Sequence, residues 1–113
     1  MVIVKNNIIP FKGFTALTLW PFIFVRKDEE KYYTDVVDRH EHIHGEQQKE
    51  MLIVFFLLLY GVEWLVKWAY YRNSMTAYKN ISFEREAYAN QNNVAYLNER
   101  KPYAFLKYLT KNN

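Results

Sequence analysis

Three residues of this sequence are well suited to chemistry: His40, Glu41 and His44. On a helix, residues i and i+4 lie on the same face, so the two imidazoles can bind one metal ion together. Glu41 lies beside that face, within reach of a water molecule bound to the ion. Zinc lowers the pKa of such a water to about 7, and a neighbouring carboxylate can take its proton. The spacing therefore predicts a zinc site at which an activated water attacks a polarised carbonyl group.

The residues that follow this motif bear on the position of a third ligand. On a regular helix His42 is rotated by about 200° from His40, so we expect it to face solvent or a second site. One class of zinc peptidases continues the motif as HExxHxxGxxH, with a glycine turn before a third histidine. Gln47 and Glu50 occupy those two positions here. Without the glycine the helix should continue and carry Glu50 away. We therefore expect the third ligand on a later helix, and Gln47 either supporting the metal face or packing in the core.

One later stretch offers a glutamate in suitable surroundings, the sequence ISFEREAYAN over residues 81–90. It resembles the glutamate helix of gluzincins, in which a small residue at i+3 allows close packing and an acid at i+4 orients a ligand histidine. Glu84 and Glu86 both have alanine at i+3, and they lie about 200° apart, so only one can face the metal. The resemblance favours Glu84, with Glu86 as the alternative. At i+4 the acid is replaced by Tyr88 or Asn90.

Together, HEHIHGEQQKEML and SFEREAY resemble the two signatures of a gluzincin-type zinc peptidase. The chain is similar in size to the minigluzincins, and it also resembles small proteins of Bacteroides-type bacteria that share its IFVRK, HExxHxxQQ and FExEAY segments. The resemblance implies an α+β fold, with a small N-terminal antiparallel sheet followed by a mainly helical, zincin-like core. It implies that His40, His44 and Glu84 bind Zn²⁺, that Glu41 is the general base, and that a peptide or protein is the substrate.

The same resemblance assigns roles outside the two motifs. The strand at residues 23–25 would be the sheet edge along which a peptide lies by strand addition. A tyrosine or histidine outside the motif would stabilise the transition state, and Tyr88 and Tyr103 are our candidates. Minigluzincins also imply latency, with residues 102–113 as a plug over the active site. Three functions are compatible with these features: an active peptidase, a latent or inactive metal-binding relative, and a membrane-associated helical interaction protein with incidental histidines.

The elements that must position these residues begin with a stretch rich in β-branched and aromatic residues, 2–25. Turn-like Asn-Asn and Lys-Gly pairs divide it, and we predict strands near 2–5, 8–11 and 14–25. The charged residues 26–33 read as a connecting loop. These strands would form the small antiparallel sheet.

From Thr34 onward the pattern is typical of helix. Thr34 is a suitable N-cap, and no proline interrupts residues 35–71. One straight helix of that length would measure about 55 Å, too long for a compact domain of this size. We therefore expect a bend or break, with Gly45 and Gly61 as the weak points.

The remainder is also predicted to be mostly helical. We expect a loop over 74–81, a helix from 83 to about 97 with Ser82 as its N-cap, and a short terminal helix over 102–110. A chain of 113 residues fits a single domain, residues 1–113.

Composition limits the classes of function. The chain has no cysteine, so a metal must be bound by His, Asp or Glu, and a reducing, cytoplasmic location fits. Its net charge is +3, and its Lys and Arg residues are scattered, which disfavours nucleic acid as a partner. We find no pattern of a secretory signal.

An uninterrupted apolar run, residues 51–62, contains no charge, and its extension to Tyr71 adds Glu63 and Lys67. Twelve helical residues cover about 18 Å, short of the roughly 30 Å of a bilayer core. We therefore favour a helix buried in the core or in a homo-oligomer interface. The alternative is membrane association through residues 51–71, which would place the protein at the inner membrane.

Overall fold

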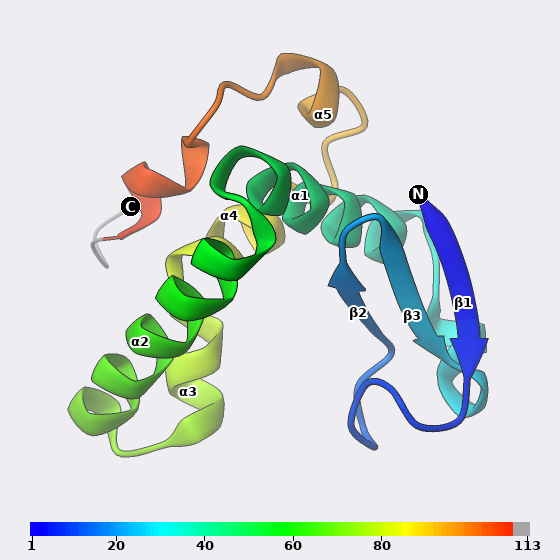
Figure 1. The fold of residues 1–113 in the computed structure, drawn as a ribbon, viewed down its shortest axis with the longest axis horizontal. Helices are drawn as coiled ribbons and strands as arrows, with labels where there is room; N and C mark the ends of the chain where they lie inside the picture. Colours follow the sequence, from blue (N-terminus) through cyan, green and yellow to red (C-terminus); the bar gives the residue numbers. More distant parts are fainter. Residues whose placement is uncertain (110–113) are drawn as a thin grey trace.

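The computed structural model describes residues 1–109 and has the expected α+β organisation, a small N-terminal sheet followed by helices (Figure 1). The sheet has three strands in the order β1-β3-β2. β3 pairs in parallel with β1 and antiparallel with β2. The sheet is therefore mixed, and the prediction of an antiparallel sheet was wrong. The strand bounds are Val2–Asn6 for β1, Ala16–Leu19 for β2 and Phe22–Arg26 for β3.

The error arose from the expected strand at 8–11, which does not form. The side chain of Asn6 accepts hydrogen bonds from the backbone N–H groups of Ile8 and Ile9, at 2.8 and 2.6 Å. These donors are thereby held in a local turn and are not offered to a strand partner. The second and third strands instead both come from residues 16–26, as a hairpin that turns at Trp20-Pro21.

The position of β3 also corrects the expected substrate edge. Because β3 lies between β1 and β2, both of its sides are paired, and residues 23–25 are not a sheet edge. The edge nearest the helices is β2, which packs against the first long helix.

The long helical region is broken, as expected, but at Leu52 and not at a glycine. It forms α1, Asp35–Met51, and α2, Ile53–Tyr71, and Leu52 between them has a φ of 59°. Thr34 caps α1 as predicted, accepting from the N–H of Val37. Gly45 lies inside α1, where a Cβ atom would be 2.7 Å from the Met1 side chain. Gly45 thus allows close packing, and neither it nor Gly61 breaks the helix.

The later elements are shorter than predicted. They are the 3-10 helix η1 (Lys27–Tyr32), the helices α3 (Ser74–Lys79), α4 (Ser82–Asn90) and α5 (Tyr96–Glu99), and the 3-10 helix η2 (Ala104–Tyr108). The expected loops at 26–33 and 74–81 therefore contain helical turns. The expected helix 83–97 ends at Asn90, and the part of the expected terminal helix at residue 110 lies outside the described residues.

The starts of α3 and α4 differ from the prediction in their capping residues. Asn73 caps α3, since its side chain accepts from the N–H of Thr76 at 2.9 Å. Ser82 does not cap α4; its N–H and its hydroxyl both donate to the Glu63 carboxylate, each at 2.6 Å. Ile81 occupies the N-cap position, without a side-chain hydrogen bond.

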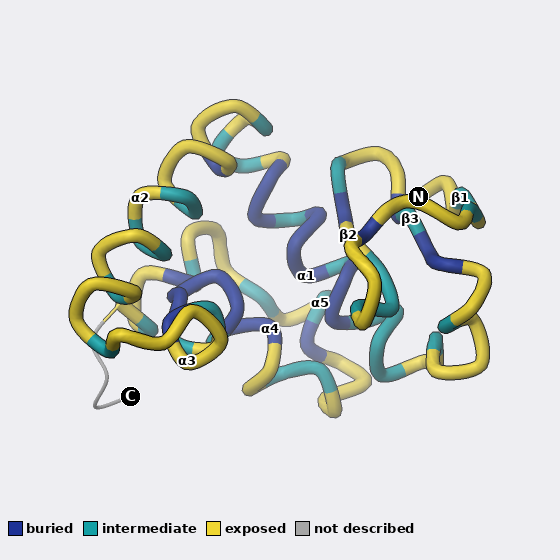
Figure 2. The backbone as a smooth tube through the Cα atoms, turned by 90° about the horizontal axis from the view of Figure 1, so that it is seen from below, coloured by how far each residue is buried: buried dark blue, intermediate teal, exposed yellow. Residues whose placement is uncertain are grey.

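The core is small and lies around α4. One buried cluster joins α2, α4 and η2 through Phe56, Ile81, Phe83 and Phe105. A second joins α1, α4 and α5 through Ile43, Ala87 and Tyr96. In Figure 2 the buried parts of the tube gather in α1 and α4, whereas α2 is mostly exposed.

Helix α2 contradicts the prediction of a helix buried in the core. Among its residues only Phe56 is buried. By length and composition only, α2 is long and apolar enough to cross a membrane. The reason for the difference is that one side of α2 packs against α3 and reaches α4 through the side chains of Tyr60 and Glu63, while the rest of its circumference has no partner in the described chain.

Candidate metal centre

His40 and His44, one turn apart on α1, meet Glu84 from the first turn of α4. The Nε2 atoms of both histidines lie 3.1 Å from Oε1 of Glu84. The three residues are buried, and their potential ligand atoms all lie within 4.8 Å of one another. Ligand atoms around a tetrahedral zinc ion are about 3.3 Å apart. The cluster could therefore occupy three of the four positions around such an ion.

The other ring nitrogen of each histidine is held by a glutamine. Nδ1 of His44 lies 2.8 Å from Oε1 of Gln47, and Nδ1 of His40 lies 2.7 Å from Oε1 of Gln91. The orientation of the Gln47 amide is fixed, because its NH₂ group donates to the Phe83 carbonyl and to Glu86. Its oxygen must therefore accept from His44. A proton on Nδ1 leaves the Nε2 lone pair of His44 directed at Glu84, as metal ligation requires.

Lone pairs and a carboxylate that converge in a buried place require a cation between them. In the metal-free chain that cation is a proton. Burial alone would lower the pKa of His44, but the Glu84 carboxylate outweighs burial and raises it to about 9. Burial would also raise the pKa of Glu84, but the two histidines hold it well below its usual range. A divalent ion would satisfy the same demand for positive charge.

We predict that zinc affinity rises with pH. His44 must lose its proton to bind a metal, and its pKa in the metal-free chain is about 9. Below pH 9 the affinity should therefore increase by up to about tenfold per pH unit, and the dependence should flatten above it. Titration in chelator-buffered zinc from pH 6.5 to 9.5 measures this slope. His42→Ala should keep it, whereas an affinity independent of pH would contradict the protonated His44.

The same proton affects stability without metal. Because the folded pKa of His44 lies above the ordinary value of 6.5, its contribution to stability is complete below pH 6.5 and is lost as the pH rises through about 9. Metal binding removes this dependence, since the metal replaces the proton.

Glu41 faces a cavity beside the cluster. The cavity has a volume of about 420 Å³, and Glu41, His44 and Glu84 all line it. Oε1 of Glu41 accepts a hydrogen bond from the Thr18 hydroxyl at 2.7 Å. The other walls are mainly apolar, from β2, α2, α3 and the loop before β2. The carboxylate is thus buried, oriented by a strand residue and open to the same space as the cluster.

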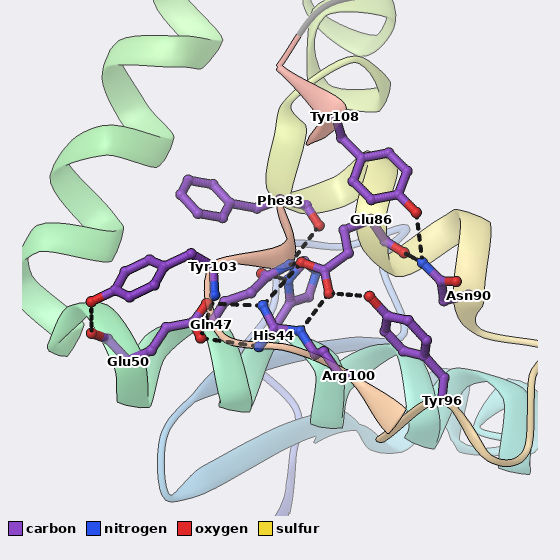
Figure 3. Close-up of polar contacts among 10 residues, drawn as sticks. All are labelled: His44, Gln47, Glu50, Phe83, Glu86, Asn90, Tyr96, Arg100, Tyr103 and Tyr108. Atoms are coloured by element: carbon purple, nitrogen blue, oxygen red, sulfur yellow. Dashed lines mark hydrogen bonds and ion pairs between the residues drawn. The ribbon is translucent and has the colours of Figure 1, made fainter. Parts of the chain in front are cut away.

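Glu86, the alternative third ligand, lies away from the two histidines. It is fully buried and accepts hydrogen bonds from Gln47 at 2.9 Å and from Tyr96 at 2.7 Å. It also forms an ion pair with Arg100, which donates to Glu50 as well, at 2.9 and 3.1 Å (Figure 3). Glu86 therefore supports the Gln47 side chain that holds His44.

The remaining candidates lie outside the cluster. His42 contacts the Asp38 carbonyl, and Glu50 pairs with Arg100. The ring of Tyr88 packs against His40 at 4.5 Å, but Tyr88 does not line the cavity. Tyr103 donates to the Glu50 carbonyl and does not line the cavity, so it is not placed to act on a substrate there.

The expected C-terminal plug is not found in the described part of residues 102–113. Phe105 packs on Phe83, and the Tyr108 carbonyl accepts from Arg85 on α4. Residues 102–109 do not line the cavity. Residues 110–113 lie outside the described chain.

Several residues of the site carried no recognisable signal in the sequence. Gln91 follows α4 and orients His40; Tyr60 on α2 donates to Oε2 of Glu84 at 2.7 Å; and Thr18 orients Glu41. Each comes from an element whose position depends on the tertiary fold. Comparisons with protein families, with curated proteins and with solved structures found no match for this chain.

Proposed function

We propose that this protein is a minimal zinc-dependent peptidase with a zincin-like core. The observation that carries the proposal is the convergence of His40, His44 and Glu84 at one buried point, with Glu41 on the wall of the adjoining cavity. These residues offer the two imidazoles, the carboxylate ligand and the base that zinc-assisted hydrolysis needs. The likeness of the two motifs to gluzincins supports the same assignment.

The residues divide the chemistry among them. A bound zinc ion would supply an acidified water and polarise the substrate carbonyl. Glu41, on the wall of the cavity, would serve as the base that takes a proton from such a water and as the acid that delivers it to the departing amine. The Thr18 hydroxyl, bonded to Oε1, leaves the other oxygen of Glu41 free for this transfer. Gln47 and Gln91 keep both histidines in the tautomer that presents Nε2 to the metal.

The cavity supports an extended peptide as substrate. Residues 16–19 of β2, an edge strand, form one wall, and a peptide could extend the sheet there. Gln48 already occupies the far part of this edge, since its amide donates to the Thr18 carbonyl at 2.8 Å and accepts from the Trp20 N–H at 2.6 Å; a peptide would therefore pair with the edge before the Thr18 carbonyl. Phe14, Leu57 and other apolar walls favour apolar side chains. Tyr78 also lines the cavity and is our candidate for stabilising charge on the carbonyl oxygen.

Cleavage of a mixture of extended peptides, followed by mass spectrometry, tests the proposal. We expect zinc-loaded protein to cleave peptides beside apolar residues, chelation to stop cleavage, and added zinc to restore it. Stoichiometric zinc without cleavage of any peptide would instead support the metal-binding, catalytically inactive alternative.

A further inference from the structure

The polarity of α2 is inverted relative to that of an ordinary surface helix. Its two charged residues, Glu63 and Lys67, lie on the side that packs against the protein. Glu63 accepts two hydrogen bonds from Ser82, and Lys67 binds Glu63 at 2.7 Å and the Asn80 carbonyl. Tyr60 likewise turns its hydroxyl inward to Glu84. The polar groups of α2 therefore face the protein.

The outward side of α2 is apolar throughout. Figure 2 shows that most of α2 is exposed. Every exposed residue of this helix is aliphatic or aromatic, and the most exposed are Val54, Phe55, Leu58, Leu65, Val66 and Tyr70. At 100° per residue the exposed positions span about 220° of the circumference, and the helix is about 28 Å long. A monomeric soluble protein rarely leaves so large an apolar surface uncovered.

Positive charge borders this surface. Arg72, at the end of α2, and Lys79, at the end of α3, are exposed, and no acidic residue occurs from 64 to 83. Lys12 is exposed and precedes Phe14 by two residues; the Phe14 ring lies 5.9 Å from that of Tyr78 on α3, and Lys12 also lies within electrostatic range of Asp28. Residues 1–27 also contain no acid. Exposed cations at the ends of α2 and α3, next to an apolar face, complement anionic lipid headgroups above acyl chains.

The cavity lies beside the same surface. Three residues both line the cavity and are exposed: Leu57 of α2, Met75 of α3 and Phe11 from the loop before β2. A surface that covers α2 would therefore also lie near the entrance of the cavity.

We propose that the outer face of α2 inserts into the surface of a bilayer that contains anionic lipid, with the cationic residues at the headgroups. The helix lies in the interface and does not span the bilayer, because its other side is bonded to α3 and α4 through Glu63 and Lys67. A second copy of the chain is a weaker candidate for covering this face. It would bring its own exposed cations against those of the first copy, and residues 1–27 and 64–83 contain no acidic residue to pair with them. The proposal does not depend on peptide hydrolysis.

Flotation of the full chain with vesicles tests this proposal. We expect binding to vesicles of phosphatidylcholine and phosphatidylglycerol in equal parts. The double variant Leu58→Asp, Leu65→Asp should bind at least about tenfold less. Val94→Asp, which changes an exposed apolar residue outside α2, should bind as the wild type does. The triple variant Lys12→Gln, Arg72→Gln, Lys79→Gln should lose the preference for phosphatidylglycerol over phosphatidylcholine alone.

Unchanged zinc binding by these variants would show that they fold. A loss of vesicle binding in a variant that still binds zinc then concerns the α2 face alone and not the proposed hydrolysis. Wild-type protein that floats with neither kind of vesicle would overturn the proposal, as would equal flotation of the double variant. A lipid-free dimer that Leu58→Asp, Leu65→Asp dissociates, without flotation of the wild type, would assign the face to a second copy.

Discussion

Replacing Glu41 by glutamine should reduce peptide hydrolysis by about 10²–10⁴-fold while zinc binding is unchanged. Glutamine has nearly the same shape as glutamate, and its side-chain oxygen can still accept the hydrogen bond from the Thr18 hydroxyl. It cannot take a proton from water. The variant therefore removes the base without changing the cavity or the three proposed ligands. Single-turnover cleavage and zinc titration of the same sample measure the two properties together.

Glu46→Gln is the matched control, because Glu46 lies on the same helix and pairs with Lys49 away from the cavity. It should cleave at the wild-type rate. Glu41→Gln protein that cleaves as fast as the wild type would exclude Glu41 as the base. Loss of zinc in Glu41→Gln would instead make this carboxylate a ligand.

Replacing Arg100 by methionine should lower the free energy of unfolding by about 3–5 kcal/mol. Arg100 is the cation between Glu86, which is fully buried, and Glu50, which is partly buried. Methionine keeps much of the volume but leaves both carboxylates without this positive partner, and the unpaired charge of the fully buried Glu86 is the costly one. This loss is a large fraction of the stability of a domain of this size. Urea unfolding measures it.

Two further variants separate charge from packing at this position. Lys101→Met, at an exposed neighbour, should leave stability nearly unchanged. Glu86→Gln combined with Arg100→Met should recover part of the loss, because the amide needs no cation. Equal stability of Arg100→Met and the wild type would show that Glu86 does not depend on this ion pair.

The part of the site that could be predicted is the part set by helix geometry. The i, i+4 spacing alone brings His40 and His44 to one face, and Glu84 and Glu86 cannot face the same point. These statements need only a helix at the right place. The structure brings Glu84, and not Glu86, to the histidines.

The residues that orient these groups could not be predicted, because they depend on how the elements pack. Gln91 reaches His40 only because α4 ends beside α1, and Thr18 reaches Glu41 only because β2 lies next to that helix. Apart from the proposed ligand Glu84, only Gln47 among the residues we named contacts a histidine through its polar group. Its position one turn after His44 explains why it could be recognised.

The fold was predicted less well where local hydrogen bonds decided it. Asn6 diverted residues 8–11 from the sheet, and Asn73 started a helix within an expected loop. The break at Leu52 was unexpected because a leucine rarely adopts a positive φ. The apolar composition of α2 suggested burial within the chain. Composition alone does not distinguish such a helix from one whose apolar face contacts a surface outside the chain.

The central claim is that His40, His44 and Glu84 bind one zinc ion, and zinc titration combined with X-ray absorption spectroscopy tests it most directly. We expect one zinc per chain, with nitrogen and oxygen ligands at about 2.0–2.2 Å and a clear imidazole signal. His44→Ala and Glu84→Ala should each lose high-affinity binding, whereas His42→Ala should keep it. Well-folded protein that binds no zinc, or zinc bound with the same ligand shell in His44→Ala, would contradict the account.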